Sequence, residues 1–407
     1  MMSGYRSPNL PQCSAAVVGW LTNPRPDAVA STTAGWDADD WEAARWSMQV
    51  HGIAPLLDRA FESSANGAAL PERLRTYLAE QRRLSGQRVA RLLDELAAIL
   101  QAAHRQRIAV APLKGSLLAT NYYDQPGLRP MNDLDLLVHP ADEARMLGVL
   151  TGLGYRKAAR GWKHIVLSRP DGAGPVVSYE GEHPNNPRSI ELHVRVAEQF
   201  WGIRYELTSE IWAGSIPGML LGAQAQVLQP AALLHHLVVH ASSDTIARRL
   251  RLLHLHDIAL VAARVDHTGW SQIVRAAQAR HEERLVYPAL LLASRYYPII
   301  PADVVATLRP GVPLALLRHL DDSALDRLSF CNTAPTTPAE KLCWFRPGRE
   351  RLGAIRHMLL PDPNEMAHWF PRMAQPILLP VAYARYGALL LRWGLRRARG
   401  RSRMMLP

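Results

Sequence analysis

The chain has 407 residues, of which 48% are hydrophobic, and a formal net charge of +11. This length and apolar share are typical of a folded protein with a buried core and more than one subdomain. Three scattered cysteines, Cys13, Cys331 and Cys343, exclude a disulfide scaffold or a cysteine zinc site and indicate a reducing compartment, so we expect a cytoplasmic protein.

The positive charge predicts an attraction for polyanions such as nucleotides or nucleic acid. Much of it lies in a tail with six arginines within twelve residues, Arg392, Arg396, Arg397, Arg399, Arg401 and Arg403. We expect this tail to fray in solvent, with nucleic acid or anionic lipid as conceivable contacts. Because the tail lacks aromatic residues after Trp393, no base-stacking platform is evident and nucleic acid is not favoured as a partner.

The N-terminal part is expected to be helical. Residues 1–35 are rich in Pro, Ser and Thr and are predicted to be loosely ordered at the start, without a signal peptide. From Asp37 to Gln106 the pattern is helical, and Asp37 or Asp39 is suited to cap the first helix. A long helix is predicted from residues that recur at helical spacing, Val89, Leu92, Leu93, Leu96, Leu100 and His104.

Residues 108 to about 215 have a mixed pattern that predicts a small α/β sheet. The expected strands are 108–113, 134–138, 163–168, 176–180 and 189–194. The expected helices are 116–122 and 141–153, the second closed by Gly154. Residues 171–174, Asp-Gly-Ala-Gly, are typical of a turn between two strands.

Two of the expected strands carry acids in alternation. Asp133 and Asp135 share one face of the first, and Glu191 and His193 share one face of the second. If these strands are neighbours, three carboxylates converge and repel one another unless a cation lies among them. Mg²⁺ or Mn²⁺ suits such a site, and two metals together can clamp an in-line displacement at phosphorus. We therefore predict Asp133, Asp135 and Glu191 as metal ligands, with His193 beside them as an outer partner.

A Lys-Gly-Ser turn precedes the acids. Gly115 allows a close backbone approach, and the free amides at a helix start near Ser116 form an anion site. Lys114 and Arg129 are suited to offset phosphate charge, Arg129 with bidentate geometry. The alternatives are that Lys114 only caps a strand and that Arg129 only holds the loop before Asp133.

From Pro230 to about Ile300 the pattern is helical again. His236 and His240 lie one turn apart and could share a metal, but the sequence shows no third ligand. Arg248, Arg249 and Arg251 are expected either to line a nucleotide cleft or to form a solvated basic face. No membrane span is predicted, since the uncharged run Met373–Ala384 has only twelve residues where about 20 are needed.

These motifs carry a resemblance to a known family. A Gly-Ser turn, then Asp-x-Asp, then a third acid resembles the signature of the nucleotidyltransferase superfamily, which includes polymerase beta-like proteins. The chain is more similar still to an uncharacterised nucleotidyltransferase family of bacterial proteins with K-G, R-P-x-x-D-x-D-L-L-V and I-E-L-H motifs. Here those motifs are Lys114-Gly115, Arg129–Val138 and Ile190–His193. The resemblance covers roughly residues 36–265.

The resemblance implies an α+β fold in which a small mixed-sheet nucleotidyltransferase core is flanked by helical regions. The expected division is an N-terminal helical region, 1–106, a catalytic core, 107–222, and a C-terminal helical region with the basic tail, 223–407. The resemblance also implies an enzyme that transfers an NMP from an NTP, with ATP expected, onto a hydroxyl or other nucleophile. Asp133, Asp135 and Glu191 would hold Mg²⁺ or Mn²⁺, and Lys114, Gly115, Ser116, Arg129 and His193 would contact the nucleotide.

The acceptor is left open by the residues. Relatives of this family suggest a tailoring step on a small molecule or a peptide, as in natural-product biosynthesis. The alternatives are a non-catalytic nucleotide-binding or regulatory protein, and a transferase that AMPylates a protein side chain.

Overall fold

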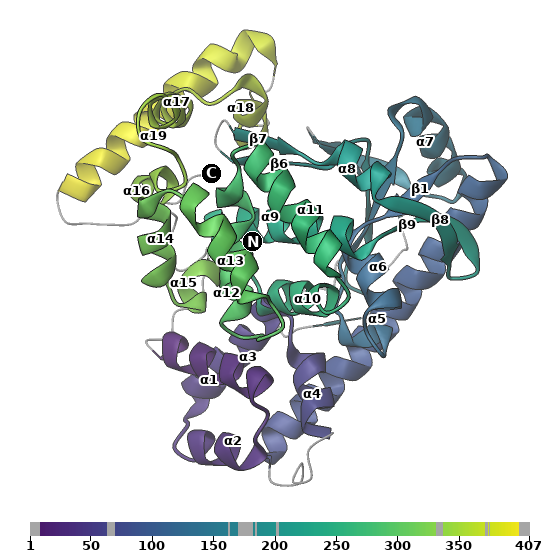
Figure 1. The fold of residues 1–407 in the computed structure, drawn as a ribbon, viewed down its shortest axis with the longest axis vertical. Helices are drawn as coiled ribbons and strands as arrows, with labels where there is room; N and C mark the ends of the chain where they lie inside the picture. Colours follow the sequence, from purple (N-terminus) through teal and green to yellow (C-terminus); the bar gives the residue numbers. More distant parts are fainter. Residues whose placement is uncertain are drawn as a thin grey trace.

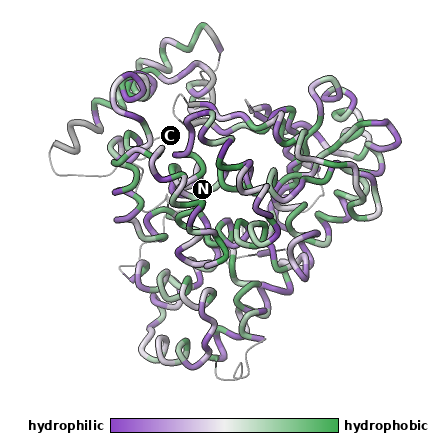
Figure 2. Tube along the Cα trace, viewed as in Figure 1, coloured by the Kyte–Doolittle hydropathy of each residue, from purple (hydrophilic) through white to green (hydrophobic). Residues whose placement is uncertain are grey.

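The computed structural model describes residues 9–62, 70–161, 163–169, 182–183, 185–200, 203–330, 337–370, 373 and 375–398. These residues form an α+β fold in which helices surround a small mixed sheet, as predicted (Figure 1). One hydrophobic core extends through the chain from Leu10 to Ala354. Figure 2 shows polar and apolar residues alternating along the helices, as expected for helices that bury one face.

The N-terminal part is helical from residue 10 onward, so the loose order expected at the start of the chain does not extend over residues 10–33. Residues 1–8 lie outside the described residues. The N-terminal helices are α1 (Leu10–Thr22), α2 (Pro26–Thr33), α3 (Ala38–His51), α4 (Ala54–Glu62) and α5 (Glu72–Arg105). Helix α1 lies along α3 and buries Cys13, Val17 and Trp20. Asp37 caps α3 by accepting hydrogen bonds from the Asp39 and Asp40 amides, which confirms one of the two predicted caps.

The sheet that carries the acids has five strands in the order β1-β2-β5-β4-β3. Their bounds are β1 (Val110–Pro112), β2 (Asp133–Val138), β3 (Arg156–Arg160), β4 (His164–Ser168) and β5 (Ser189–His193). β2 and β5 pair in parallel, whereas the other neighbours are antiparallel. The leucines that alternate with the acids, Leu134, Leu136 and Leu192, are buried and anchor this register. The strand predicted at 176–180 and the turn at 171–174 lie outside the described residues.

Short elements connect and cover the sheet. They are α6 (Lys114–Asn121), η2 (Pro126–Leu128), η3 (Pro140–Asp142), α7 (Glu143–Gly152) and α8 (Thr208–Ala213). Two hairpins complete the region, β6 (Ala197–Phe200) with β7 (Ile203–Glu206), and β8 (Ser215–Leu220) with β9 (Ala223–Leu228). The β8–β9 hairpin, absent from the sequence prediction, lies against α5 and β1.

The rest of the described chain is helical. Its elements are α9 (Pro230–Ile246), α10 (Leu252–Ala262), α11 (His267–Ala279), η4 (Glu283–Leu285), α12 (Tyr287–Ser294), α13 (Ala302–Leu308), η5 (Arg309–Gly311), α14 (Leu314–Asp321), α15 (Leu325–Ser329), α16 (Pro338–Leu342), α17 (Arg349–Leu359), α18 (Pro363–Trp369), η7 (Pro376–Leu378) and α19 (Leu379–Ala398). A separate small cluster of Met366, Phe370, Ala382 and Tyr386 joins α18 to α19. Among the helices in the described ranges, none has the length and apolar character needed to cross a bilayer.

Candidate functional site

The parallel pairing of β2 and β5 brings the predicted acids together. Asp135 lies directly opposite Glu191 in the register, and Asp133 lies opposite Ser189. Because side chains two residues apart share a face of a strand, Asp133, Asp135, Glu191 and His193 project from the same face of the sheet. The metal-site prediction requires that the two strands bearing the acids be neighbours, and they are.

Asp135 is the most strongly paired of the acids. Its Oδ1 lies 2.9 Å from Lys114 Nζ and 3.0 Å from His193 Nε2. Burial alone would raise the pKa of Asp135, but Lys114 and His193 outweigh it and hold that pKa well below its usual value. Burial lowers the pKa of His193, but its hydrogen bonds to Asp135 and Glu191 outweigh burial and raise that pKa. Asp135 is therefore a carboxylate at neutral pH, held between Lys114 and His193.

Asp133 has a different environment. No cation lies within ion-pair distance of it among the residues that the structure describes, although it lines the same cavity as Asp135. Burial and the neighbouring Asp135 carboxylate raise the pKa of Asp133, and Lys114 only partly opposes them. An acid that is kept close to another acid without a counterion of its own is the kind of group that a bound cation would stabilise.

Glu191 lies between two histidines. Its Oε2 is 3.3 Å from His164 Nδ1 and 3.5 Å from His193 Nε2, and the three ligand atoms of this group all lie within 4.8 Å of one another. His164 comes from β4, where the antiparallel register places it beside His193. His164 was assigned no role from the sequence. The alternation of β4 predicts the face on which it lies, but only the strand pairing places it beside Glu191.

The Lys-Gly-Ser turn has an unusual backbone conformation and is closely packed against neighbouring side chains. Lys114 has a φ of +43°, in the left-handed region that is unfavourable for a residue with a side chain. A Cβ at Gly115 would lie 2.5 Å from Arg129 Nη1 and 3.0 Å from Met131 Sδ, so a side chain there would displace the Arg129 guanidinium. Strain at a residue that contacts Asp135 is typical of a functional site.

Two predicted nucleotide contacts have structural partners instead. The Ser116 hydroxyl is buried and donates to the Leu113 carbonyl at 3.1 Å. Arg129 forms a bidentate pair with the buried Asp257 of α10, in which Nη2 lies 2.8 Å from Oδ2, and Tyr123 donates to the same carboxylate. These contacts favour the alternative in which Arg129 holds the loop before Asp133, and phosphate binding by both residues stays a prediction.

A cavity of about 690 Å³ opens over the acids. Besides Lys114, Gly115, Arg129, Asp133, Asp135 and Glu191, it is lined by Lys163, His164, Glu198, His240, Asp244, Arg249, Arg251 and His254. Two of the three arginines considered from the sequence, Arg249 and Arg251, therefore reach the cavity, whereas Arg248 pairs with Glu340.

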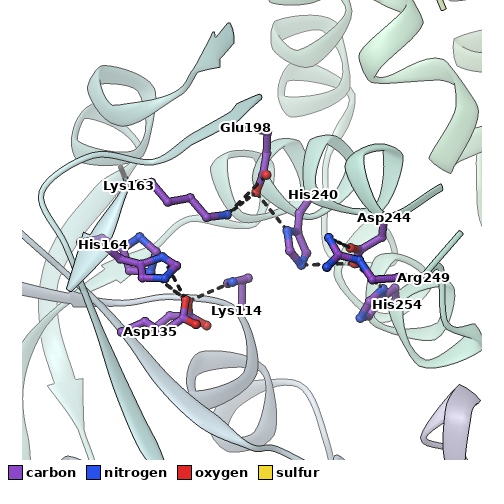
Figure 3. A network of polar contacts seen from close by, with 11 residues as sticks. Lys114, Asp135, Lys163, His164, Glu198, His240, Asp244, Arg249 and His254 are labelled. Atoms are coloured by element: carbon purple, nitrogen blue, oxygen red, sulfur yellow. Dashed lines mark hydrogen bonds and ion pairs between the residues drawn. The ribbon is translucent and has the colours of Figure 1, made fainter. Parts of the chain in front are cut away.

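A second polar cluster lies on the wall formed by α9 and α10, opposite Lys114, Asp135 and His164 (Figure 3). Glu198 joins the two sides, with Lys163 Nζ 3.3 Å and His240 Nδ1 3.1 Å from its Oε1. Although burial opposes it, the hydrogen bond from His240 keeps the pKa of Glu198 low. Sequence reasoning missed Glu198, Asp244 and His254; the His240-to-Asp244 spacing of one helical turn was the available signal.

The fold combines a small mixed sheet, two paired strands that bear acids, and a polar cavity over them. Residues 37–298 match the family model described as uncharacterised nucleotidyltransferase, and the chain belongs to this family. The match confirms the resemblance inferred from the K-G, D-x-D and I-E-L-H motifs, and it extends beyond the expected end of that resemblance to residue 298, just past α12.

Two solved structures are similar to part of the chain. One is described as the antibiotic-resistance factor ANT(2'')-Ia, with 14% sequence identity, a TM-score of 0.35, and coverage of 47% of this chain and 94% of that one. The other is an antigenic nucleotidyltransferase-like protein from Paracoccidioides brasiliensis, with 14% identity, a TM-score of 0.29, and coverage of 51% and 94%. No curated protein matches the chain.

Proposed function

We propose that this protein transfers a nucleoside monophosphate from an NTP, with ATP expected, onto a hydroxyl or other nucleophile of an acceptor, and that the reaction depends on a divalent metal. Membership of the family supports nucleotidyl transfer. The observation that carries the finer proposal is the register of β2 and β5, which puts Asp135 opposite Glu191 with Asp133 on the same face.

The donor set fits a hard divalent cation. Mg²⁺ takes a few carboxylate oxygens and leaves its other positions to water and phosphate. Asp133, which has no ion-pair partner among the described residues, and the paired Asp135 and Glu191 would hold Mg²⁺ or Mn²⁺, which when bound supplies charge neutralisation at the phosphates. The position of Asp133 at the cavity supports this assignment.

The protein's own residues supply orientation and charge. Arg249 and Arg251 line the cavity and are placed to contact the triphosphate, together with Lys114 and the amides that follow it. The acceptor oxygen attacks the α-phosphorus, a new phosphorus–oxygen bond forms, and the bond to pyrophosphate breaks. Glu191 orients the acceptor hydroxyl and receives its proton. Most of the rate would come from positioning and preorganised charge.

The acceptor is proposed to be a small molecule or a peptide that enters the cavity. A volume of about 690 Å³ is within the range of sites that hold small ligands. Transfer onto a protein side chain is the second candidate. Incubation of the protein with α-labelled ATP and a cell lysate separates the two, because a labelled small product supports the first and a labelled protein band supports the second.

A non-catalytic nucleotide-binding role is the remaining alternative. It predicts that NTP binds without formation of pyrophosphate in any lysate fraction. The presence of all three carboxylates in one cavity supports the enzyme instead. Pyrophosphate release measured with and without lysate distinguishes the enzyme from a non-catalytic protein. Release that requires Asp135 supports nucleotidyl transfer, and NTP binding without release contradicts it.

A further inference from the structure

The cluster on the α9–α10 wall has the composition of a transition-metal site. His240 and Asp244 lie one turn apart on α9, and His254 comes from the first turn of α10. Their ligand atoms all lie within 4.8 Å of one another. Two imidazole nitrogens and one carboxylate oxygen form the three-ligand set typical of a zinc site that keeps a further position open.

The distances in this cluster fit co-ligands better than hydrogen bonds. His240 Nε2 and His254 Nδ1 lie 3.5 Å and 3.3 Å from the same oxygen of Asp244, Oδ2. A charge-assisted N–H to carboxylate bond is shorter, about 2.7–2.9 Å. Two ligands about 2.1 Å from a tetrahedral metal lie about 3.4 Å apart, which agrees with both contacts.

A second observation points to the same ligand. His254 Nδ1 is a buried ring nitrogen without a hydrogen-bond partner among the described residues, and it is aimed at Asp244. A buried polar atom that is left without a partner costs free energy, and a bound cation would satisfy it. A proton would satisfy it less well, because the 3.3 Å separation is long for an N–H to carboxylate bond.

The surroundings of His240 complete the pattern. Its other ring nitrogen, Nδ1, lies 3.1 Å from Glu198 Oε1. A ligating histidine commonly donates its second N–H to a carboxylate, which fixes the tautomer and the ring orientation. Glu198 holds His240 with Nε2 turned toward Asp244 (Figure 3).

We propose that His240, Asp244 and His254 bind a divalent transition-metal cation of the zinc type, oriented through Glu198. This site has one acid and two histidines, whereas the carboxylate site has three acids, which suit Mg²⁺, with His164 and His193 beside Glu191. Substitution of His254 distinguishes the two sites. Because all three ligands line the cavity, the open position faces whatever binds there. The metal site itself does not rest on the proposed function.

Cobalt(II) is the probe, since a tetrahedral cobalt site with histidine ligands absorbs far more strongly in the visible than an octahedral oxygen site. Metal-free protein is titrated with Co²⁺ and followed by absorption and by equilibrium dialysis. The Asp133→Ala/Asp135→Ala variant is expected to keep one tightly bound equivalent with the tetrahedral spectrum. Failure of the nucleotide proposal would therefore leave this result unchanged.

His254→Gln and Asp244→Asn are each expected to weaken cobalt binding by more than about 100-fold and to abolish the tetrahedral spectrum, because each removes a ligand. Glu198→Gln should weaken binding by about 10- to 100-fold and keep the spectrum, since it changes only the orientation of His240. His256→Gln is the matched control on α10, because His256 Nδ1 contacts Tyr297 Oη and not this cluster.

Circular dichroism of each variant confirms its folding. Absence of a tetrahedral spectrum in folded wild-type protein would overturn the proposal. Equal cobalt binding by the His254→Gln and His256→Gln variants would overturn it as well, because binding would then come from other residues.

Discussion

Asp135 and Glu191 lie opposite each other on two parallel neighbouring strands, although 56 positions separate them in the sequence. This relationship converts two separate motifs, D-x-D and I-E-L-H, into one face with three carboxylates. It also explains the contacts around them, since Lys114 and His193 approach Asp135 while His164 approaches Glu191. The face opens onto a single cavity, whose far wall carries a second set of potential ligands.

Asp133→Asn is expected to stabilise the metal-free protein while abolishing Mg²⁺-dependent nucleotide binding. Asp133 shares a face with Asp135 and has no ion-pair partner among the described residues, so its negative charge is unfavourable until a cation binds. Urea denaturation and nucleotide titration measure the two effects. Asp94→Asn, on the exposed face of α5, is the control and should change neither. A variant that is less stable yet binds nucleotide normally would contradict the assignment.

Lys114→Gly is expected to be more stable than Lys114→Ala by about 1–2 kcal/mol, because the left-handed backbone at this position is unfavourable for any residue with a Cβ. Both variants lose the contact with Asp135, so their difference reports the backbone alone. At Arg145, within α7, the order should reverse, with glycine about 1 kcal/mol less stable than alanine. If the alanine variant is the more stable one at position 114 as well as at position 145, the backbone at Lys114 is not strained.

Arg129→Ala is expected to lower the free energy of unfolding by about 3–5 kcal/mol, because it leaves the buried carboxylate of Asp257 without its cationic partner. The double variant with Asp257→Ala should lose less than the sum of the two single variants. Arg145→Ala, which breaks an exposed pair with Asp142, should cost less than about 1 kcal/mol. If Arg129→Ala folds as stably as the wild type, the residue serves ligand binding and not the loop.

We expect the free energy of unfolding to fall in mild acid because of His51. Burial, aided by the charge of Arg251, lowers the pKa of His51 from 6.5 to about 3. Its Nδ1 accepts a hydrogen bond from the Leu252 amide, so protonation would break a native contact. The unfolded state therefore binds more protons below pH 6.5, and stability falls as the pH is lowered, by about 2 kcal/mol between pH 7 and 5 from this residue alone.

His51→Asn should reduce that pH dependence by about the same amount, as measured by urea denaturation at several pH values. His104→Asn, at an exposed position of α5, should leave the pH dependence unchanged. An unaltered pH dependence in His51→Asn would show that His51 is protonated in the folded state.

Local patterns in the sequence predicted the parts of the fold that depend on local structure. Alternation gave the faces of β2 and β5, Asp37 gave the start of α3, and the apolar spacing gave the long helix α5. The helices α1 and α2 were missed because Pro, Ser and Thr disfavour helix, while burial of Cys13, Val17 and Trp20 against α3 provides the stabilisation. The β8–β9 hairpin was missed for a similar reason, because its pairing with the rest of the core is a tertiary effect.

Some residues of the candidate site could be predicted from the sequence, and others could not. The acids of β2 and β5 were found because strand alternation is local, whereas the pairing that joins them is not. His164, Glu198 and His254 come from other strands and helices, and only the three-dimensional arrangement brings them to the cavity. The division at residues 106 and 222 and the cytoplasmic location stay predictions.

Calorimetric titration of ATP, GTP, CTP and UTP into the protein, with and without Mg²⁺, tests the central claim most directly. We expect at least one nucleotide to bind in a Mg²⁺-dependent manner to the wild type and to Asp94→Ala, and not to bind to Asp133→Ala/Asp135→Ala. Binding that survives in the double variant, or that is absent from the wild type with every nucleotide and metal, would contradict the assignment of these carboxylates.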